Sequence, residues 1–200
     1  MYDDIYNLPK HIKDVQKNFE NYCNIQSEFN DIDKIVILGM GGSAITGLFM
    51  KELYKNSIKI PIHVVQNYDI PNWINKKTLI IASSYSGNTE ETLISCKKCI
   101  DKNAKNIIGF TTGGKLLKLL NENNISDHIK LPIGLQPRAA IGYTFTMMIN
   151  LFYKINLIEK SEIELIDKSI NYLEKLNQIY SKSNENNIAY KFSKIIYKKN

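Results

Sequence analysis

Apolar residues recur at three- and four-residue intervals through the first thirty positions of the chain. This is the stripe of an amphipathic helix, and we predict one over residues 3–30 that covers one face of a sheet. The residues that form the stripe are Ile12, Val15, Phe19, Tyr22, Ile25 and Phe29.

Short apolar runs then alternate with segments of helical length. The runs predict strands at residues 34–38, 61–65, 78–83, 106–110 and 128–131, and helices are predicted at 44–54, 89–102 and 115–123. Strands that are apolar throughout and separated by helices are typical of a parallel sheet buried on both faces. We therefore predict an α/β fold with a doubly wound, five-stranded parallel sheet flanked by helices, as in flavodoxin-like sandwiches.

The pattern changes after Pro137. An apolar helix is predicted over residues 139–155, an amphipathic and more polar one over 163–180, and a further helix over 188–197 for which no partner layer is evident. We predict that residues 1–155 form one domain and that residues 156–200 form a helical extension.

Composition narrows the classes of function. The chain has 200 residues, 44% of them apolar, and a net charge of +6. No apolar run approaches the roughly 18 residues of a membrane span, and Met1–Lys17 lacks the apolar core of a signal peptide, so we expect a cytoplasmic protein without a membrane partner. The lysines are scattered and Arg138 is the single arginine, a pattern that favours solvated helix faces over a nucleic-acid surface.

The cysteines and histidines do not predict a metal or redox centre. The odd number of cysteines, three, fits a reducing compartment. Cys96 and Cys99 form a CxxC, but in the middle of a predicted helix, where packing is the simpler interpretation. His11, His63 and His128 lie on predicted regular elements and are interpreted as packing or surface residues.

Two loops at predicted strand ends carry candidate chemistry. The first, Gly39-Met40-Gly41-Gly42-Ser43, lies between a strand and a helix. Glycines permit close approach of a ligand, and the helix start presents free N–H groups to an anion. With Ala44 the loop also fits the dinucleotide fingerprint, which keeps a nucleotide-binding fold as a competitor. Against that fold, no acidic residue is well placed after Val65, and Asp69 lies further on.

The second loop separates these interpretations. Residues 84–92 read SYSGNTEET and place the hydroxyls of Ser84, Ser86 and Thr89 around a glycine at a helix start. Hydroxyl and N–H donors can bind a phosphate dianion without a metal. An ordinary helix cap would explain one of the three hydroxyls. We therefore predict a phosphate site.

These motifs resemble those of SIS (sugar isomerase) domains, and in combination those of bifunctional phosphoglucose/phosphomannose isomerases. SYSGNTEET is similar to the SxSGxTxET phosphate loop, and GMGGSAITG is similar to the glycine-serine loop of that branch. Gln136-Pro137-Arg138-Ala139-Ala140 is similar to its Pro-Arg stretch. The resemblance covers most of residues 34–155, in matching order, and is to the N-terminal part of the family.

The resemblance implies reversible isomerisation of hexose 6-phosphates through a cis-enediolate, with no metal or organic cofactor. Ser84, Ser86 and Thr89 would hold the phosphate, while Gly41, Gly42 and Ser43 would contact the substrate. Arg138 would stabilise enediolate charge, a role that suits a permanently protonated planar donor. A homodimer is also implied.

The family pattern places the catalytic glutamate and the ring-opening histidine in a second SIS domain. We expect residues 156–200 to include the truncated start of that domain, so the base and the histidine are expected to be absent from the chain. Glu90 and Glu91 are the acids near the phosphate loop, and their simpler role is to complement the helix dipole. The alternative function is a SIS module that binds or senses a sugar phosphate without turnover.

Overall fold

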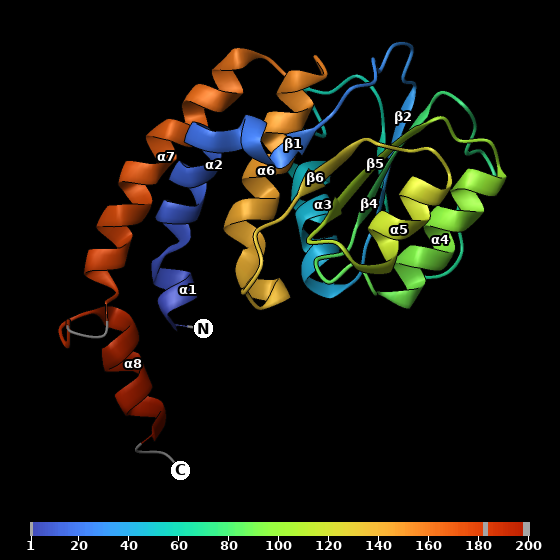
Figure 1. Ribbon diagram of the computed structural model, residues 1–200. Coiled ribbons are helices and arrows are strands. Elements are labelled where there is room, and N and C mark those ends of the chain that lie inside the picture. Colours follow the sequence, from blue (N-terminus) through green and yellow to red (C-terminus); the bar gives the residue numbers. More distant parts are fainter. Residues whose placement is uncertain (1, 182–183, 198–200) are drawn as a thin grey trace.

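One sheet organises the fold. In the computed structural model, which describes residues 2–181 and 184–197, six strands lie in the order β1-β6-β5-β4-β2-β3 (Figure 1). The strands are β1 (Cys23–Asn24), β2 (Lys34–Leu38), β3 (Ile62–Val65), β4 (Thr78–Ser83), β5 (Asn106–Thr111) and β6 (His128–Lys130). The five predicted strands are confirmed, and β1 is an addition.

The parallel part of the sheet is doubly wound. Strands β2 to β6 pair with one another in parallel, and the chain passes from β2 outward to β3 before it crosses back to β4 on the other side of β2. Counted from β2, this is the flavodoxin-like order 2-1-3-4-5 and not the order 3-2-1-4-5-6 of dinucleotide-binding folds. The topology therefore disfavours the nucleotide-binding alternative.

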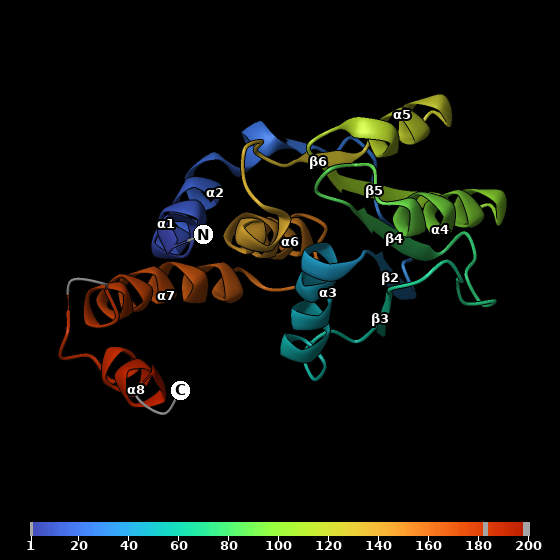
Figure 2. The same cartoon turned by 90° about the horizontal axis from the view of Figure 1, so that it is seen from below.

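Helices cover both faces of the sheet (Figure 2). Ile35 and Ile37 of β2 point to the face packed by α2, α3 and α6, whereas Val36 and Leu38 point to the face packed by α4 and α5. All four side chains are fully buried, which explains the apolar run. The helices of the sandwich are α2 (Leu8–Tyr22), α3 (Gly41–Leu53), α4 (Glu90–Asp101), α5 (Gly114–Glu122) and α6 (Ile141–Lys154), the last preceded by the 3-10 turn η1 (Pro137–Ala140).

The predicted helix over residues 3–30 is wrong in its extent. A short helix α1 (Tyr2–Tyr6) precedes α2, and α2 ends at Tyr22, after which β1 pairs antiparallel with β6. The carboxylate of Asp127 accepts hydrogen bonds from the Gln26 and Ser27 amides at 2.7 and 3.2 Å. The backbone of residues 23–27 thus bonds to edge strand β6 and to Asp127. A longer helix α2 would lose these hydrogen bonds.

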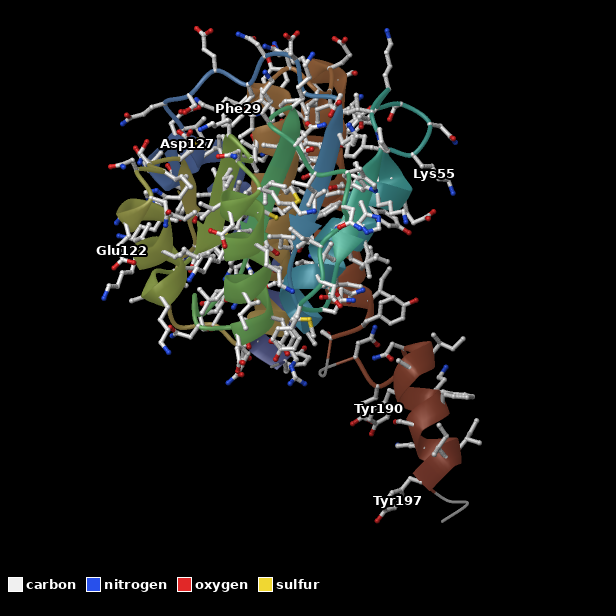
Figure 3. The ribbon with its side chains drawn as sticks, turned by 90° about the vertical axis from the view of Figure 1, so that its right-hand side faces the viewer. Phe29, Lys55, Glu122, Asp127, Tyr190 and Tyr197 are labelled. Atoms are coloured by element: carbon white, nitrogen blue, oxygen red, sulfur yellow. The ribbon has the colours of Figure 1, made fainter. Side chains whose placement is uncertain are left out.

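The spacing of apolar residues did not reveal this helix end because the same spacing continues beyond Tyr22. Ile25 and Phe29 still pack against the core, from a loop. Phe29 lies near Asp127 at the amino end of the parallel strands (Figure 3).

Helices α7 (Lys160–Ile179) and α8 (Ile188–Tyr197) differ in how they are packed. Helix α7 lies along α2 and α6, and Lys13 pairs with Glu174 across the α2–α7 contact. Helix α8 has no buried residue and projects away from the sandwich (Figures 1 and 3). On the face of the sheet packed by α2, α3 and α6, the outermost packed helix is therefore α7 and not α8.

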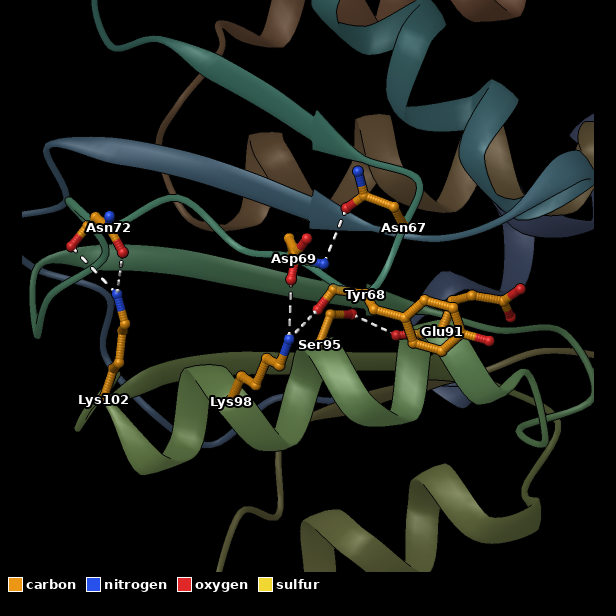
Figure 4. Close-up of polar contacts among 8 residues, drawn as sticks. All are labelled: Asn67, Tyr68, Asp69, Asn72, Glu91, Ser95, Lys98 and Lys102. Carbon is orange, nitrogen blue, oxygen red and sulfur yellow. Dashed lines mark hydrogen bonds and ion pairs between the residues drawn. The ribbon is translucent and has the colours of Figure 1, made fainter.

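The connection from β3 to β4 runs along α4 and is held there by two lysines one helical turn apart (Figure 4). Lys98 Nζ donates to the Tyr68 carbonyl at 2.8 Å and pairs with Asp69 at 3.1 Å. Lys102 Nζ donates to the carbonyl and side-chain oxygens of Asn72, both at 3.3 Å. Asp69, the acid considered for a nucleotide ribose, is thus engaged by Lys98.

The cysteines and the described helices fit the remaining expectations. Burial raises the pKa of the Cys96 and Cys99 thiols to about 12, and both pack against the sheet from the inner face of α4. Their inward position confirms packing. Across residues 2–181 and 184–197, no helix combines the length and apolar character that a bilayer crossing needs.

Candidate phosphosugar site

The two predicted loops meet at the point where the chain reverses direction across the sheet. Strands β2 and β4 are neighbours, with Leu38 opposite Ala82, so the loops that follow them lie side by side at the carboxyl edge. The first loop leads to α3 on one face and the second to α4 on the other. In doubly wound sheets this divergence opens the crevice in which ligands bind.

The glycine loop is packed too tightly for side chains at two of its positions. A Cβ atom on Gly39 would lie 3.1 Å from the Ser83 carbonyl oxygen, and one on Gly42 would lie 3.1 Å from Cα of Arg138. Gly42 therefore brings the start of α3 against η1. The contact joins the glycine loop to the Pro-Arg segment.

The serine loop is internally hydrogen-bonded. Ser84 Oγ and Thr89 Oγ1 are 2.9 Å apart, and the Thr89 amide donates to Ser84 Oγ at 3.4 Å. Ser86 Oγ accepts from the Asn88 amide at 3.2 Å. Ser84 is fully buried, while Ser86 is exposed. The structure thus brings Ser84 and Thr89 together at the start of α4 and leaves Ser86 at the rim.

Helix α4 begins without a side-chain cap, although its N-cap residue is Thr89. The first backbone bond of the helix runs from the Leu93 amide to the Thr89 carbonyl, so the amides of Glu90 to Thr92 precede it. Since the Thr89 hydroxyl faces Ser84 and not these amides, the simple cap interpretation fails. The helix start instead offers N–H groups beside two hydroxyls, which is an arrangement that binds anions.

The third loop, after β5, packs against the serine loop. Gly87 has φ of +68°, and a Cβ atom there would lie 1.8 Å from the Gly113 carbonyl oxygen. The Leu116 amide donates to the Gly87 carbonyl at 2.8 Å, and the Lys115 amide donates to the Asn88 side chain at 3.1 Å. These bonds use amides at the start of α5, and they hold the turn of the serine loop against that helix.

Arg138 is exposed on η1, beside Gly42. Its guanidinium forms no hydrogen bond or ion pair with the part of the chain that the structure describes. Ser43 is buried, and its Oγ accepts from the Tyr85 amide at 3.3 Å. The predicted residues Gly42, Ser43, Ser84, Thr89 and Arg138 thus lie on adjoining segments of one edge.

The three histidines lie apart from this edge or are engaged. His63 is exposed on β3 and packs edge-on against Trp73, and His128 Nδ1 contacts the Ser126 carbonyl at 2.8 Å. His11 is buried on α2 and stacks on Tyr143. These placements confirm packing and surface roles.

Tyr85 is the residue of the site that the sequence did not reveal. It stands inside the serine motif as a spacer, yet it is buried and bonds to three other segments. No local pattern could have signalled this, because its partners lie as many as 50 residues away in the chain.

Comparisons with known proteins agree with this geometry. The sequence pattern of the SIS domain matches residues 28–118, a span that holds the glycine and serine loops. The chain is 43% identical over 181 residues to a bifunctional phosphoglucose/phosphomannose isomerase of Caldicellulosiruptor bescii. Residues 28–118 thus carry a SIS domain.

A second relative carries the same name. The chain is 33% identical over 195 residues to the bifunctional phosphoglucose/phosphomannose isomerase of Aquifex aeolicus. The match covers 90% of this chain and 52% of the Caldicellulosiruptor protein, and 93% and 58% in the Aquifex case. The chain thus spans about half the length of these curated relatives.

A solved structure shares the fold. Tagatose-6-phosphate ketose/aldose isomerase from Escherichia coli superposes with a TM-score of 0.62 at 14% identity, over 87% of this chain and 52% of that one. At this identity the likeness establishes the SIS fold, and the function has to be argued from the site.

Proposed function

We propose that this SIS domain is the phosphosugar-binding half of an aldose-ketose isomerase that interconverts glucose 6-phosphate or mannose 6-phosphate with fructose 6-phosphate. The observation that carries the proposal is the pairing of Ser84 and Thr89 hydroxyls, 2.9 Å apart, at the uncapped start of α4. Hydroxyl and amide donors in this arrangement bind a phosphate dianion without a cation, and the proposed site includes no cofactor. Ser86 contributes from the rim.

The neighbouring strand end supplies the sugar side of the site. With the phosphate at α4, the sugar chain extends toward Gly41, Gly42 and Ser43, where close backbone approach is possible. Isomerisation moves a proton between C1 and C2 of the opened sugar and passes through an enediolate. The unpaired Arg138 guanidinium, beside Gly42, stabilises the negative charge on that intermediate.

The base and the ring-opening acid come from elsewhere in this proposal. The named relatives are about twice as long as the matched region, and Glu90 and Glu91 lie on the phosphate side, in the first turn of α4. We place the glutamate base and the histidine in a second SIS domain, of which α8 is the first helix. Residues 1–155 carry the first domain, and residues 156–200 comprise a helical linker and the start of the second domain.

A non-catalytic role is the alternative. The Vibrio vulnificus NanR protein, solved in complex with ManNAc-6P, shares the fold with a TM-score of 0.50 at 12% identity. The observation that favours this alternative is the position of the histidines, none of which lies in the described serine loop, glycine loop or η1. A sensor would bind the sugar phosphate through the same donors.

The wider setting follows from the proposed activity. An enzyme of hexose phosphate metabolism with three free cysteines fits the cytoplasm. We propose a homodimer whose sites borrow residues across the interface, because large apolar side chains are exposed on α3 and α8. Sedimentation equilibrium tests this: a mass near twice 23.0 kDa supports the dimer, and a mass near 23.0 kDa contradicts it.

Proton NMR of fructose 6-phosphate in D2O tests the site. We expect line-broadening in the presence of the chain, and Ser84→Ala is expected to weaken binding by at least about tenfold, because it removes a hydrogen bond to a charged group. Ser95→Ala is the matched control. Ser95, like Ser84, is buried, but it lies on α4 and its hydroxyl bonds the Glu91 carbonyl at 2.7 Å. It should bind as the unaltered chain does.

Three results are informative. Absence of broadening would refute the phosphosugar site. Equal losses for Ser84→Ala and Ser95→Ala would place the effect in helix stability and not in the loop. Deuterium uptake at C1 or C2 would show that a base lies within these 200 residues and would remove the need for a second domain.

A further inference from the structure

Tyr85 links the serine loop to the segment that leads to Arg138. The residue follows Ser84 directly, and its side chain, 8% exposed, packs in the core on the face of α2, α3 and α6. Its hydroxyl donates to the Pro132 carbonyl at 2.7 Å and accepts from the Leu135 amide at 2.9 Å. A single oxygen therefore spans both ends of the turn between residues 132 and 135.

The backbone of Tyr85 reaches two further loops. Its amide donates to Ser43 Oγ of the glycine loop at 3.3 Å, and its carbonyl accepts from the Thr112 amide, in the loop after β5, at 3.0 Å. Tyr85 thus joins its own serine loop to the glycine loop, the loop after β5 and the turn after β6.

The turn at residues 132–135, which leads to η1 and Arg138, has few other polar anchors. Leu131 is tied to β5 through the Thr111 carbonyl, and the next backbone bonds run from Ala139 and Ala140 to the Gln136 carbonyl, inside η1. Between these points, in the described hydrogen bonds, Tyr85 supplies the polar contacts of residues 132–135. Ile133 is 80% exposed, and Gly134 has φ of +94°, so packing contributes little at the tip of this turn.

We propose that Tyr85 is a positioning residue whose hydroxyl, bonded to Pro132 and Leu135, sets the place of Arg138 relative to the phosphate-binding hydroxyls. The inference rests on the proposed function. The phosphate is held by residues on either side of Tyr85 in the chain, while the guanidinium reaches the other end of the sugar from η1. Loss of the hydroxyl releases the turn and leaves the serine loop in place, since Ser84 and Thr89 bond each other.

The test compares two ligands in Tyr85→Phe, which keeps the ring. Inorganic phosphate probes the serine loop alone, and 5-phospho-D-arabinonate carries a carboxylate where the enediolate bears its charge. We expect Tyr85→Phe to weaken phosphoarabinonate binding about tenfold, the usual effect of losing a well-formed hydrogen bond, and to change phosphate binding less than twofold. Calorimetry measures both affinities on the full chain.

A double-mutant cycle separates positioning from a general structural role. Arg138→Ala alone should weaken phosphoarabinonate binding, and Tyr85→Phe should add less than about twofold in that background, because its effect passes through the guanidinium. Tyr54→Phe is the control, since Tyr54 is buried at the C-terminal end of α3, opposite the glycine loop, and its hydroxyl faces Glu162. It should leave both affinities unchanged.

Amide hydrogen exchange gives a reading that needs no ligand. In Tyr85→Phe the Leu135 amide should exchange faster while the Thr89 amide keeps its protection. Equal loss of both ligands, additive effects with Arg138→Ala, or an unchanged Leu135 amide would overturn the inference. If the unaltered chain binds neither ligand, the proposed function fails first, and the inference fails with it; a chain that binds both ligands and shows no effect of Tyr85→Phe refutes the inference alone.

Discussion

In the serine loop, the hydroxyls of Ser84 and Thr89 form a hydrogen bond with each other at 2.9 Å. A phosphate at this position exchanges an internal hydrogen bond for bonds to a dianion, which are about twice as strong. The loop is already folded by its contacts with the residues after β5, so little ordering entropy opposes binding. Single-residue geometry thus favours a preorganised site.

Gly87 is the residue whose replacement should cost most at this site. Gly87→Ala is expected to lower the free energy of unfolding by roughly 3 kcal/mol or more, because it combines a left-handed backbone with a collision against the Gly113 carbonyl 1.8 Å away. Gly41→Ala is the matched variant. Its φ is +49° with no atom within 4 Å of the added Cβ, and a cost of about 1 kcal/mol is expected.

Urea unfolding measures both variants. The comparison isolates the collision, since positive φ is common to the two positions. Similar costs would mean that the loop after β5 moves aside easily and that the serine loop is held by other contacts.

At the scale of elements, the sequence predicted what depends on local pattern. Strands β2, β4 and β5 were found because they are apolar on both faces, and α3, α4 and α5 because they alternate with strands. The end of α2 was missed because β1 exists only through its pairing with β6, some hundred residues away. The serine and glycine loops were placed correctly, whereas Tyr85 was not recognised because its role depends on long-range contacts.

The packing of α2 on α6 predicts a pH dependence of stability. His11 of α2 stacks on Tyr143 of α6 with ring centroids 4.6 Å apart, and its Nδ1 has no partner among the described residues. Burial lowers the pKa of His11 below its usual 6.5, although the Asp4 and Asp14 carboxylates oppose the effect. The unfolded chain therefore takes up this proton at a higher pH than the folded chain does.

Stability should consequently decline as the pH falls below about 6.5, the pKa of His11 in the unfolded chain, and level off once the folded form is also protonated. Urea midpoints at several pH values between about 5 and about 8 measure this slope. His11→Phe, which keeps the stacking, should flatten it. A slope that survives His11→Phe would assign it to other groups.

For the molecule as a whole, the contrast between α7 and α8 locates the edge of the folded unit. A chain that ends at Tyr180 should unfold with a free energy within about 0.5 kcal/mol of the full chain, because α8 buries no residue. A chain that ends at Ile158 should lose more than about 2 kcal/mol, since Ile163, Ile166 and Ile170 of α7 pack on the core.

Thermal and urea unfolding of the two shortened chains would decide between boundaries. The proposed boundary at residue 155 requires that the chain ending at Ile158 still unfolds cooperatively, although it is less stable without α7. A large loss on removal of α8 would instead show that this helix packs on the sandwich in solution.

The pairing of β1 with β6 also has a consequence for synthesis. Residues 8–24 contribute Val15 and Phe19 to a core completed by α6, and Cys23 lies opposite Ile129. On the ribosome this segment emerges early and waits for partners that are translated more than a hundred codons later. Its apolar stripe is then open to chaperones, and docking of the earliest-made helix becomes one of the last folding events, as expected for contacts of high sequence separation.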